Sequence, residues 1–234
     1  MQFIYEGLLY DYIYDDIRGK LVFDIGSNTG QMVKRFVNVD AKVVAVEPLS
    51  ELTSHENYNG VFAVKHMCVS DKVGEIIFYK STERTMSSCR KDWRMLNPRR
   101  MSRWTEITVP TTTLDALIEE FGKPKYIKID VEGYEDKVLA GLSHKVDLIS
   151  FEFVAGVTDC AIECVDILEK KFGFKKLMPF IKKKVKDKKG KVIKVHAYAG
   201  EYYDKEGITR YFDEEFPKLF KIANRTVGDI LVIL

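Results

Sequence analysis

The feature that most constrains the fold is a short apolar run, residues 22–25, that breaks into the glycine-containing turn DIGSNTG at residues 24–30. Gly26 and Gly30 lack a Cβ, so the backbone can turn sharply at both positions and approach a ligand closely. Residues 31–37 then carry the apolar spacing of a short helix. A buried strand that passes through a tight turn into a helix is typical of the first unit of a parallel sheet.

Strand-like and helix-like segments alternate along the rest of the chain. Apolar and β-branched runs predict strands at residues 42–46, 60–69, 75–79, 126–131 and 148–153, and helical spacing predicts helices from Thr112 or Thr113 to residue 121 and at residues 135–142 and 160–172. This alternation predicts an α/β fold with a doubly wound, mostly parallel sheet covered by helices on both faces.

The C-terminal part departs from this alternation. Residues 175–181 and 191–198 are predicted strands on either side of a turn at residues 187–190, and residues 227–234 form a last apolar strand. We therefore expect a C-terminal β-hairpin insertion and a terminal strand, which add antiparallel strands at one edge of the sheet.

The residues around the glycine turn indicate a cofactor. Ligands of open parallel sheets bind beyond the carboxyl ends of the strands. There Glu47 ends the second predicted strand, and its carboxylate can accept hydrogen bonds from both hydroxyls of a ribose. The turn has Asn28 where a dinucleotide site has its second glycine, and it lacks the Lys-Ser/Thr ending of a phosphate-binding loop. Asp24 would repel a pyrophosphate, whereas S-adenosylmethionine has no phosphate and carries an ammonium and a sulfonium. The charges therefore favour S-adenosylmethionine.

Ser70 and Asp71 follow the third predicted strand. A carboxylate at this place can accept a hydrogen bond from the exocyclic amine of adenine. Asp71 is equally well explained as an ordinary turn residue before Gly74. Both interpretations stay open.

Four stretches of the sequence resemble the FkbM family of methyltransferases. They are VFDIGSNTGQ at residues 22–31, VEP at residues 46–48, VPTTTLDAL at residues 109–117 and YIKIDVEGYEDKVLAG at residues 126–141. The resemblance runs from about residue 20 to about residue 155. It implies the class I methyltransferase fold, Rossmann-like with a seven-stranded sheet, S-adenosylmethionine as cofactor with S-adenosylhomocysteine as product, and O-methylation of sugars or hydroxylated metabolites.

The resemblance also implies a set of cofactor-binding residues. Those of the glycine turn would border the methionine half of the cofactor, Glu47 and its neighbours the ribose, and Ser70 with Asp71 the adenine. The complete set is Asp24, Gly26, Ser27, Asn28, Gly30, Gln31, Glu47, Pro48, Leu49, Ser70, Asp71 and Asp130.

The segment KIDVEGYE places three carboxylates at the carboxyl end of a central strand. Lys128 and Asp130 alternate to one face of this strand, and Glu132 and Glu135 follow it. Methyl transfer to a hydroxyl requires alignment of the acceptor and removal of a proton. We therefore expect Asp130 or Glu132 to act as the base or to orient the acceptor. In a purely structural interpretation, Lys128 neutralises the acids and Glu135 only favours the N-terminus of its helix.

Glu152, at the end of the fifth strand, is a further candidate base. Clustered carboxylates can also bind Mg²⁺, but we do not favour a divalent metal and assign no metal ligands.

Residues 84–104 form a basic segment that we interpret as a substrate loop. Its cations are Arg84, Arg90, Lys91, Arg94, Arg99, Arg100 and Arg103, against the single acid Asp92, and both tryptophans of the chain lie in it. Arginines bind phosphate or carboxylate, and indole rings stack on sugars and bases. The predicted substrate residues are Lys128, Glu135, Arg90, Trp93 and Arg94, and the acceptor can be anionic. A solvated helix anchored by its tryptophans explains the same pattern.

The chain of 234 residues, with a net charge of +2, is predicted to be a single domain. It has an N-terminal helical lid (residues 1–19), a cofactor-binding core (residues 20–155) and a C-terminal part (residues 156–234). We expect no membrane span and no signal peptide, and hence a cytoplasmic protein with four free cysteines.

The leading function is O-methylation of a small-molecule or glycan acceptor. Methylation of an RNA or nucleotide ribose is an alternative, weakened because no lysine stands beside the fifth strand to complete Lys128, Asp130 and Glu152. A non-catalytic scaffold that binds the cofactor is a second alternative. The acceptor, the metal requirement and the oligomeric state stay open.

Overall fold

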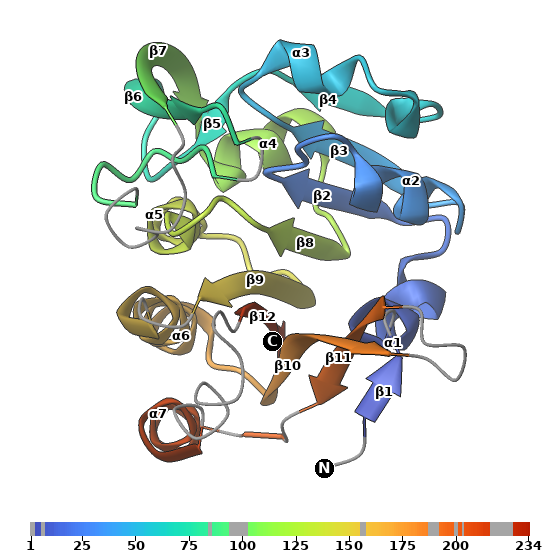
Figure 1. The fold of residues 1–234 in the computed structure, drawn as a ribbon, viewed down its shortest axis with the longest axis vertical. Coiled ribbons are helices and arrows are strands. Elements are labelled where there is room, and N and C mark those ends of the chain that lie inside the picture. Colours follow the sequence, from blue (N-terminus) through green and yellow to red (C-terminus); the bar gives the residue numbers. More distant parts are fainter. Residues whose placement is uncertain are drawn as a thin grey trace.

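The computed structural model describes residues 3–5, 8–83, 86–93, 103–154, 158–186, 192–198, 201–202, 204–215 and 227–234. Within these ranges, nine strands form one large sheet and three form a small one (Figure 1). In spatial order the large sheet consists of β1 (Phe3–Tyr5), β11 (Val192–Tyr198), β10 (Lys176–Lys186), β12 (Val227–Ile233), β9 (Leu148–Val154), β8 (Tyr126–Ile129), β2 (Leu21–Ile25), β3 (Lys42–Val46) and β4 (Ala63–Lys65).

The helices of the described ranges lie between and after these strands. They are α1 (Leu8–Ile17), α2 (Gln31–Val37), α3 (Ser50–Thr53), α4 (Leu114–Phe121), α5 (Glu135–Ala140), α6 (Thr158–Phe172) and α7 (Lys205–Arg210), with a 3-10 turn η1 (Glu56–Tyr58) and a π-helical turn η2 (Tyr211–Glu215). As predicted, Thr113 caps α4, because its hydroxyl accepts a hydrogen bond from the backbone N–H of Ala116 at 3.1 Å.

Seven neighbouring strands of the large sheet confirm the predicted α/β class. In spatial order they are β10, β12, β9, β8, β2, β3 and β4. Strands β4, β3, β2, β8 and β9 are parallel to one another, and their arrowheads mark a common carboxyl edge in Figure 1. Strand β12 is antiparallel to both of its neighbours. This mostly parallel, doubly wound sheet with one reversed strand is a methyltransferase-like fold.

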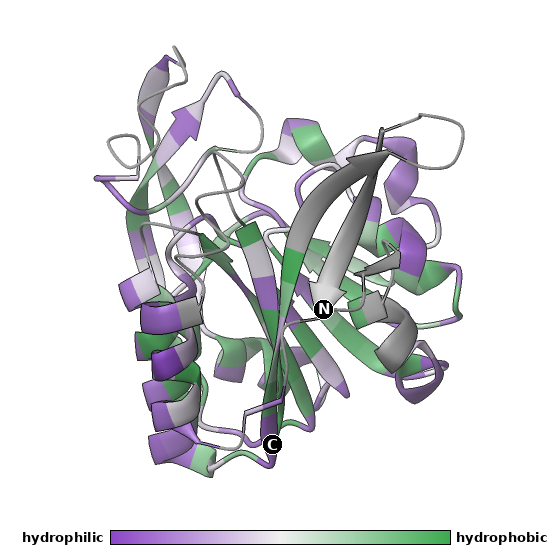
Figure 2. Ribbon diagram, turned by 60° about the horizontal axis from the view of Figure 1, so that its bottom comes forward, coloured by the Kyte–Doolittle hydropathy of each residue, from purple (hydrophilic) through white to green (hydrophobic). Residues whose placement is uncertain are grey.

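Two apolar cores fill the two faces of the sheet. Side chains such as Phe23 and Ile127 point to one face and pack against α4, α5, α6 and α7. The neighbouring positions Val22 and Tyr126 point to the other face and pack against α1 and α2. Figure 2 shows hydrophobic residues along the central strands and hydrophilic ones on the outward faces of the helices.

The small sheet is a difference from the sequence-based expectation. The predicted strand at residues 60–69 is divided into β4 and β5 (Cys68–Val69), because β5 leaves the large sheet to pair with β7 (Trp104–Thr112). The predicted strand at residues 75–79 is β6 (Gly74–Ser81), which pairs with β7 and not with the large sheet. Strand β7 itself was not predicted.

The N-terminal segment also differs from the predicted lid. Strand β1 pairs with β11 at the sheet edge. In α1, Leu9, Ile13 and Ile17 are completely buried in the same core as Val22 and Tyr126. Val22 and Tyr126 lie at the amino ends of β2 and β8. The helix is therefore a core element near the amino ends of the strands, away from the glycine turn, because its apolar residues repeat every four positions.

The hairpin insertion is present as β10 and β11, whose register pairs Phe180 with Tyr198 and Lys186 with Val192. The predicted turn at residues 187–190 lies outside the described residues. None of the described helices is long and apolar enough to cross a membrane.

Candidate active site

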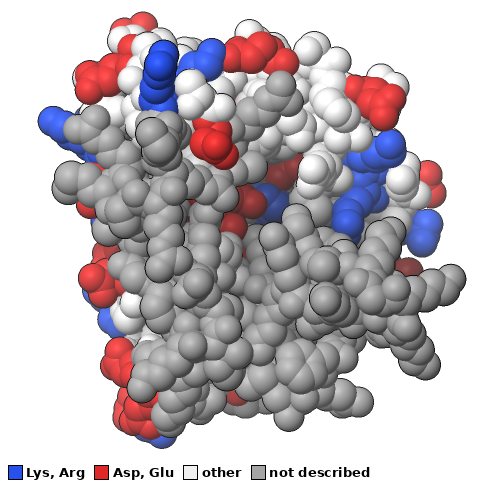
Figure 3. Space-filling view, in the orientation of Figure 1, with Lys and Arg blue, Asp and Glu red and all other residues white. Residues whose placement is uncertain are grey.

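A cavity of about 230 Å³ lies at the carboxyl edge of β2, β3 and β8. In the space-filling view, acidic and basic side chains are visible inside a hollow of this face (Figure 3). Most of the predicted cofactor residues line the cavity, namely Asp24, Gly26, Ser27, Asn28, Gln31, Glu47, Pro48, Leu49 and Asp130.

The glycine turn is held in place by backbone contacts and by a tyrosine. A Cβ on Gly26 would lie 1.9 Å from the carbonyl oxygen of Asp130, so only glycine fits between the two strands. Gly30 does not line the cavity and instead contacts the ring of Tyr58. The hydroxyl of Tyr58 donates to the carbonyl oxygen of Asn28 at 2.5 Å and lies 2.9 Å from the Ser27 hydroxyl. Tyr58, from η1, is a supporting residue that the sequence analysis missed.

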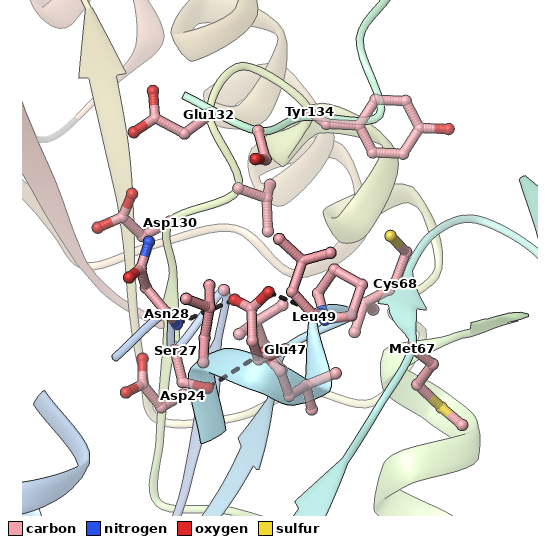
Figure 4. Close-up of a pocket in the computed structure, with 18 of the residues that line it drawn as sticks. Asp24, Ser27, Asn28, Glu47, Leu49, Met67, Cys68, Asp130, Glu132 and Tyr134 are labelled. Atoms are coloured by element: carbon pink, nitrogen blue, oxygen red, sulfur yellow. Dashed lines mark hydrogen bonds between the residues drawn. The ribbon is translucent and has the colours of Figure 1, made fainter. Parts of the chain in front are cut away.

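Glu47 projects into the cavity between the glycine turn and α3 (Figure 4). Its Oε2 accepts a hydrogen bond from the backbone N–H of Asn28, and its Oε1 accepts one from Leu49, both at 3.0 Å. Burial raises the pKa of Glu47 to about 7, although the two backbone N–H groups oppose this shift. The carboxyl is therefore fixed in orientation and titrates near neutral pH.

Asp24, Lys128 and Asp130 form a charged group on one side of the cavity. The Lys128 Nζ lies 3.6 Å from Asp24 Oδ1 and 3.1 Å from Asp130 Oδ2. Asp24 is completely buried, and neither carboxylate oxygen has a hydrogen-bond partner among the described residues. Burial raises the pKa of Asp24, although Lys128 opposes the shift. An additional cation in the cavity would offset the cost of burying the ionised carboxylate of Asp24.

Asp130 and Glu132 line the end of the cavity next to this group, and Glu152 lies beside them without lining the cavity. Oxygen atoms of Asp130, Glu132 and Glu152 all lie within 4.8 Å of one another, a spacing that can hold a proton donor, an acceptor hydroxyl or a metal ion. Figure 4 shows Asp24, Asp130 and Glu132 along the same side of the cavity. Asp229, which the sequence analysis missed, stands directly opposite Glu152 on β12.

The opposite wall comes from the small sheet, α3 with its preceding residue Leu49, and Tyr134, and of these only Leu49 was predicted to take part. Leu49, Leu52, Cys68 and Phe78 pack together here and line the cavity. Cys89 also lines this wall, and its Sγ lies 3.1 Å from that of Cys68, with both thiols free. A glycine-rich motif could not reveal this wall, because it depends on the unpredicted pairing of β5 with β7.

Ser70 and Asp71, predicted to border the adenine, stand behind this wall. The Ser70 hydroxyl donates to Asp71 Oδ1 at 3.0 Å and lies 3.3 Å from the Tyr134 hydroxyl. Tyr134 lines the cavity, whereas Ser70 and Asp71 do not. The tyrosine therefore stands between these residues and the cavity.

The predicted substrate residues fall into three groups. Lys128 lines the cavity. Glu135 does not, because it is buried below the turn and accepts hydrogen bonds from the backbone N–H groups of Val131 and Gly133. The Arg90 guanidinium donates to both carboxylate oxygens of Asp92, at 2.8 and 3.1 Å, and Trp93 is completely buried. Arg94 lies outside the described residues.

The strand order, in which the reversed β12 lies beside the parallel strands, is that of a class I methyltransferase fold, and the cavity beside Glu47 lies at the carboxyl edge of its strands. The chain belongs to the FkbM family, because the family model described as "Methyltransferase FkbM domain" matches residues 24–191. No curated protein gives a significant match.

Solved structures of low sequence identity are similar to this chain over most of its length. A protein described as an RNA methyltransferase from Pyrococcus horikoshii is 13% identical with a TM-score of 0.48, over 97% of this chain and 81% of that chain. Precorrin-6y C5,15-methyltransferase from Geobacter metallireducens is 9% identical, also with a TM-score of 0.48, over 100% of this chain and 92% of that chain.

Proposed function

We propose that this methyltransferase transfers its methyl group to a hydroxyl oxygen of a small, sugar-containing acceptor. The observation that carries the proposal is the group of carboxylates Asp130, Glu132 and Glu152, of which Asp130 and Glu132 line one end of the cavity. A hydroxyl acceptor needs a base at this place, because it must lose its proton as the new bond forms.

The glycine-turn end of the cavity is suited to the cofactor. Glu47 would accept hydrogen bonds from the ribose hydroxyls with the lone pairs that Asn28 and Leu49 leave available. Asp24 would face the cationic methionine end, since its buried oxygens have no hydrogen-bond partner among the described residues. The bound cofactor supplies an electrophilic methyl group on a sulfonium.

Among the three carboxylates we assign Glu132 as the base. In this role Glu132 would take the hydroxyl proton of the acceptor as the acceptor oxygen is methylated. Asp130, which is paired with Lys128, then orients the acceptor. Glu152 lies close enough to share either task.

The acceptor that fits these surroundings is neutral. Lys128 is already paired with two aspartates, and the guanidinium of Arg90 is occupied by Asp92. An anionic sugar, a nucleotide or RNA would have to use arginines such as Arg94, Arg99 and Arg100, which lie outside the described residues.

The test begins with the cofactor and continues with the acceptor. Calorimetric titration should give micromolar binding of S-adenosylmethionine and S-adenosylhomocysteine and no binding of NAD. Methyl transfer is then measured with neutral sugars, uronic and phosphorylated sugars, and capped RNA. Product formation with a neutral sugar and loss of this activity in Glu132→Gln support the proposal. Transfer only to nitrogen, or only to RNA, contradicts it.

A further inference from the structure

Residues 86–93 contact the turn that carries Glu132, although they belong to the basic segment. Ser88 pairs with Tyr79 of β6 through two backbone hydrogen bonds, which fixes its position beside the small sheet. Its hydroxyl donates to the carbonyl oxygen of Glu132 at 2.8 Å and accepts from the backbone N–H of Arg90 at 3.0 Å. Ser88 is completely buried, so water does not compete for these bonds.

The backbone of Glu132 has an unusual conformation that needs such support. Its φ is 58°, in the left-handed region that residues with a Cβ seldom occupy. Strained residues of this kind persist only where the surrounding structure holds them. The direction in which the Glu132 carboxylate points into the cavity depends on this conformation.

Trp93 supports the next residue of the same turn. Gly133 has a φ of 91°, and a Cβ on it would lie 2.5 Å from the Trp93 ring. The indole therefore lies directly against the Gly133 backbone. Trp93 is completely buried and packs with Val154, at the end of β9.

The turn is thus held from two sides. On one side, Glu135 accepts hydrogen bonds from the N–H groups of Val131 and Gly133. On the other side, Ser88 binds the carbonyl of Glu132 and Trp93 covers Gly133. Glu135 belongs to the turn's own helix, whereas Ser88 and Trp93 come from a segment more than thirty positions earlier.

We propose that Ser88, with Trp93 beside it, is a positioning residue for methyl transfer. Through the carbonyl of Glu132 it holds the left-handed backbone that directs the Glu132 carboxylate at the acceptor. The inference rests on the proposed role of Glu132 as the base. It assigns to the described part of the basic segment the task of placing the base, in place of binding an anion.

The test compares Ser88→Ala with Thr111→Val. Both remove a buried hydroxyl that donates to a backbone carbonyl. The Thr111 hydroxyl donates to the carbonyl oxygen of Lys72, and neither Thr111 nor Lys72 lines the cavity. We expect Ser88→Ala to lower kcat by about 10- to 100-fold with the KM for S-adenosylmethionine nearly unchanged, because small misplacements of a reacting group cost such factors. Thr111→Val should leave kcat unchanged at a similar loss of thermal stability, and Ser88→Thr, which keeps the hydroxyl, should recover most of the rate.

A second measurement needs no acceptor. The side-chain carboxyl ¹³C resonance of Glu132 is assigned by its loss in Glu132→Gln and compared among the variants. It should shift in Ser88→Ala and stay unchanged in Thr111→Val. An unchanged resonance together with an unchanged kcat would overturn the inference. If the wild-type protein methylates no hydroxyl acceptor, the proposed function fails, while the resonance still decides whether Ser88 positions Glu132.

Discussion

The two ends of the cavity are built in different ways. At the glycine-turn end, Asp24, Asn28, Glu47 and Leu49 come from two consecutive strands and the turns that follow them, and the backbone N–H groups of Asn28 and Leu49 bind the Glu47 carboxylate directly. At the carboxylate end, the acids follow or end two different strands, and the supports come from a distant segment, of which Ser88 is the best example.

This difference in how the two ends are supported indicates which function each end can have. A site held by its own motif is rigid whatever occupies the rest of the cavity, which suits a cofactor common to many methyltransferases. A site assembled from separate segments changes whenever one of those segments changes. The carboxylate end is therefore where acceptor selectivity can vary within one fold.

The largest expected effect is a loss of catalytic rate without a loss of cofactor affinity, which distinguishes the carboxylate end from the glycine-turn end. Glu132→Gln should reduce kcat by about 10²- to 10⁴-fold, the range for loss of a general base. Its affinity for S-adenosylmethionine should stay within about threefold of the wild-type value, a difference below 1 kcal/mol. Single-turnover methyl transfer and calorimetry measure the two quantities. Glu120→Gln, at a surface ion pair with Lys65, is the matched control and should change neither.

The next effect concerns the place where the two ends touch. Gly26→Ala would force a Cβ to within 1.9 Å of the Asp130 carbonyl oxygen. The free energy of unfolding should fall by about 4 kcal/mol or more, the range of exceptional single substitutions. Gly173→Ala has a similar positive φ with nothing within 4 Å and should cost only about 1–2 kcal/mol. Equal losses in urea denaturation would mean that the contact with Asp130 is not tight.

Glu47→Gln should affect binding and not chemistry. We expect about 10- to 100-fold weaker binding of S-adenosylmethionine, because an amide is a poorer acceptor than a carboxylate and cannot accept from both neighbouring N–H groups. The exposed neighbour Glu51, paired with Lys80, supplies the control Glu51→Gln. A strong loss of kcat at saturating cofactor would contradict the division between the two ends.

A pH effect of at most about tenfold follows from the same residue. With a pKa of about 7, Glu47 is mostly protonated at pH 6 and mostly ionised at pH 8. Ribose hydroxyls donate to the ionised form, so cofactor affinity should rise from pH 6 to pH 8 and then level off. Binding at pH 6 should also release a proton, which calorimetry in buffers of different ionisation enthalpy detects. Glu47→Gln should remove this pH dependence, and its persistence would point to Asp24.

Metal removal should have the smallest effect. The carboxylates Asp130, Glu132 and Glu152 have a spacing that suits a cation, but Lys128 already pairs with Asp130. We expect the activity after EDTA treatment to be within about twofold of the untreated value, a change of less than 0.5 kcal/mol in the barrier. Loss of activity that Mg²⁺ restores would assign the three carboxylates to a metal.

The sequence predicts well what depends on local pattern. The apolar runs and the glycine turn predicted the main strands and the residues that line the glycine-turn end of the cavity, since these lie within consecutive strands and the turns that follow them. Thr113 as a helix cap is another local example.

What the sequence missed depends on pairing between distant segments. Cys68 pairs with Thr111 in the small sheet, and no periodicity within either segment reveals that contact. Tyr134 and Tyr58 likewise support the cavity through contacts with residues far away in the chain. Arg90 and Trp93 were predicted to bind substrate from their chemical types alone. In the structure the Arg90 guanidinium donates to Asp92, and the Trp93 ring lies against Gly133.

The position of β12 has a consequence for how the chain folds. This strand comes after the β10–β11 hairpin in the sequence, yet it lies between β9 and β10 in the sheet. The β10–β11 hairpin and β1 are therefore not joined to the parallel strands until β12 inserts between β9 and β10. Pairing between strands that are distant in the sequence is slow. Before insertion, the edges of β9 and β10 are both exposed and prone to pairing with other chains. Aggregation during refolding should thus be governed by the arrival of this one strand.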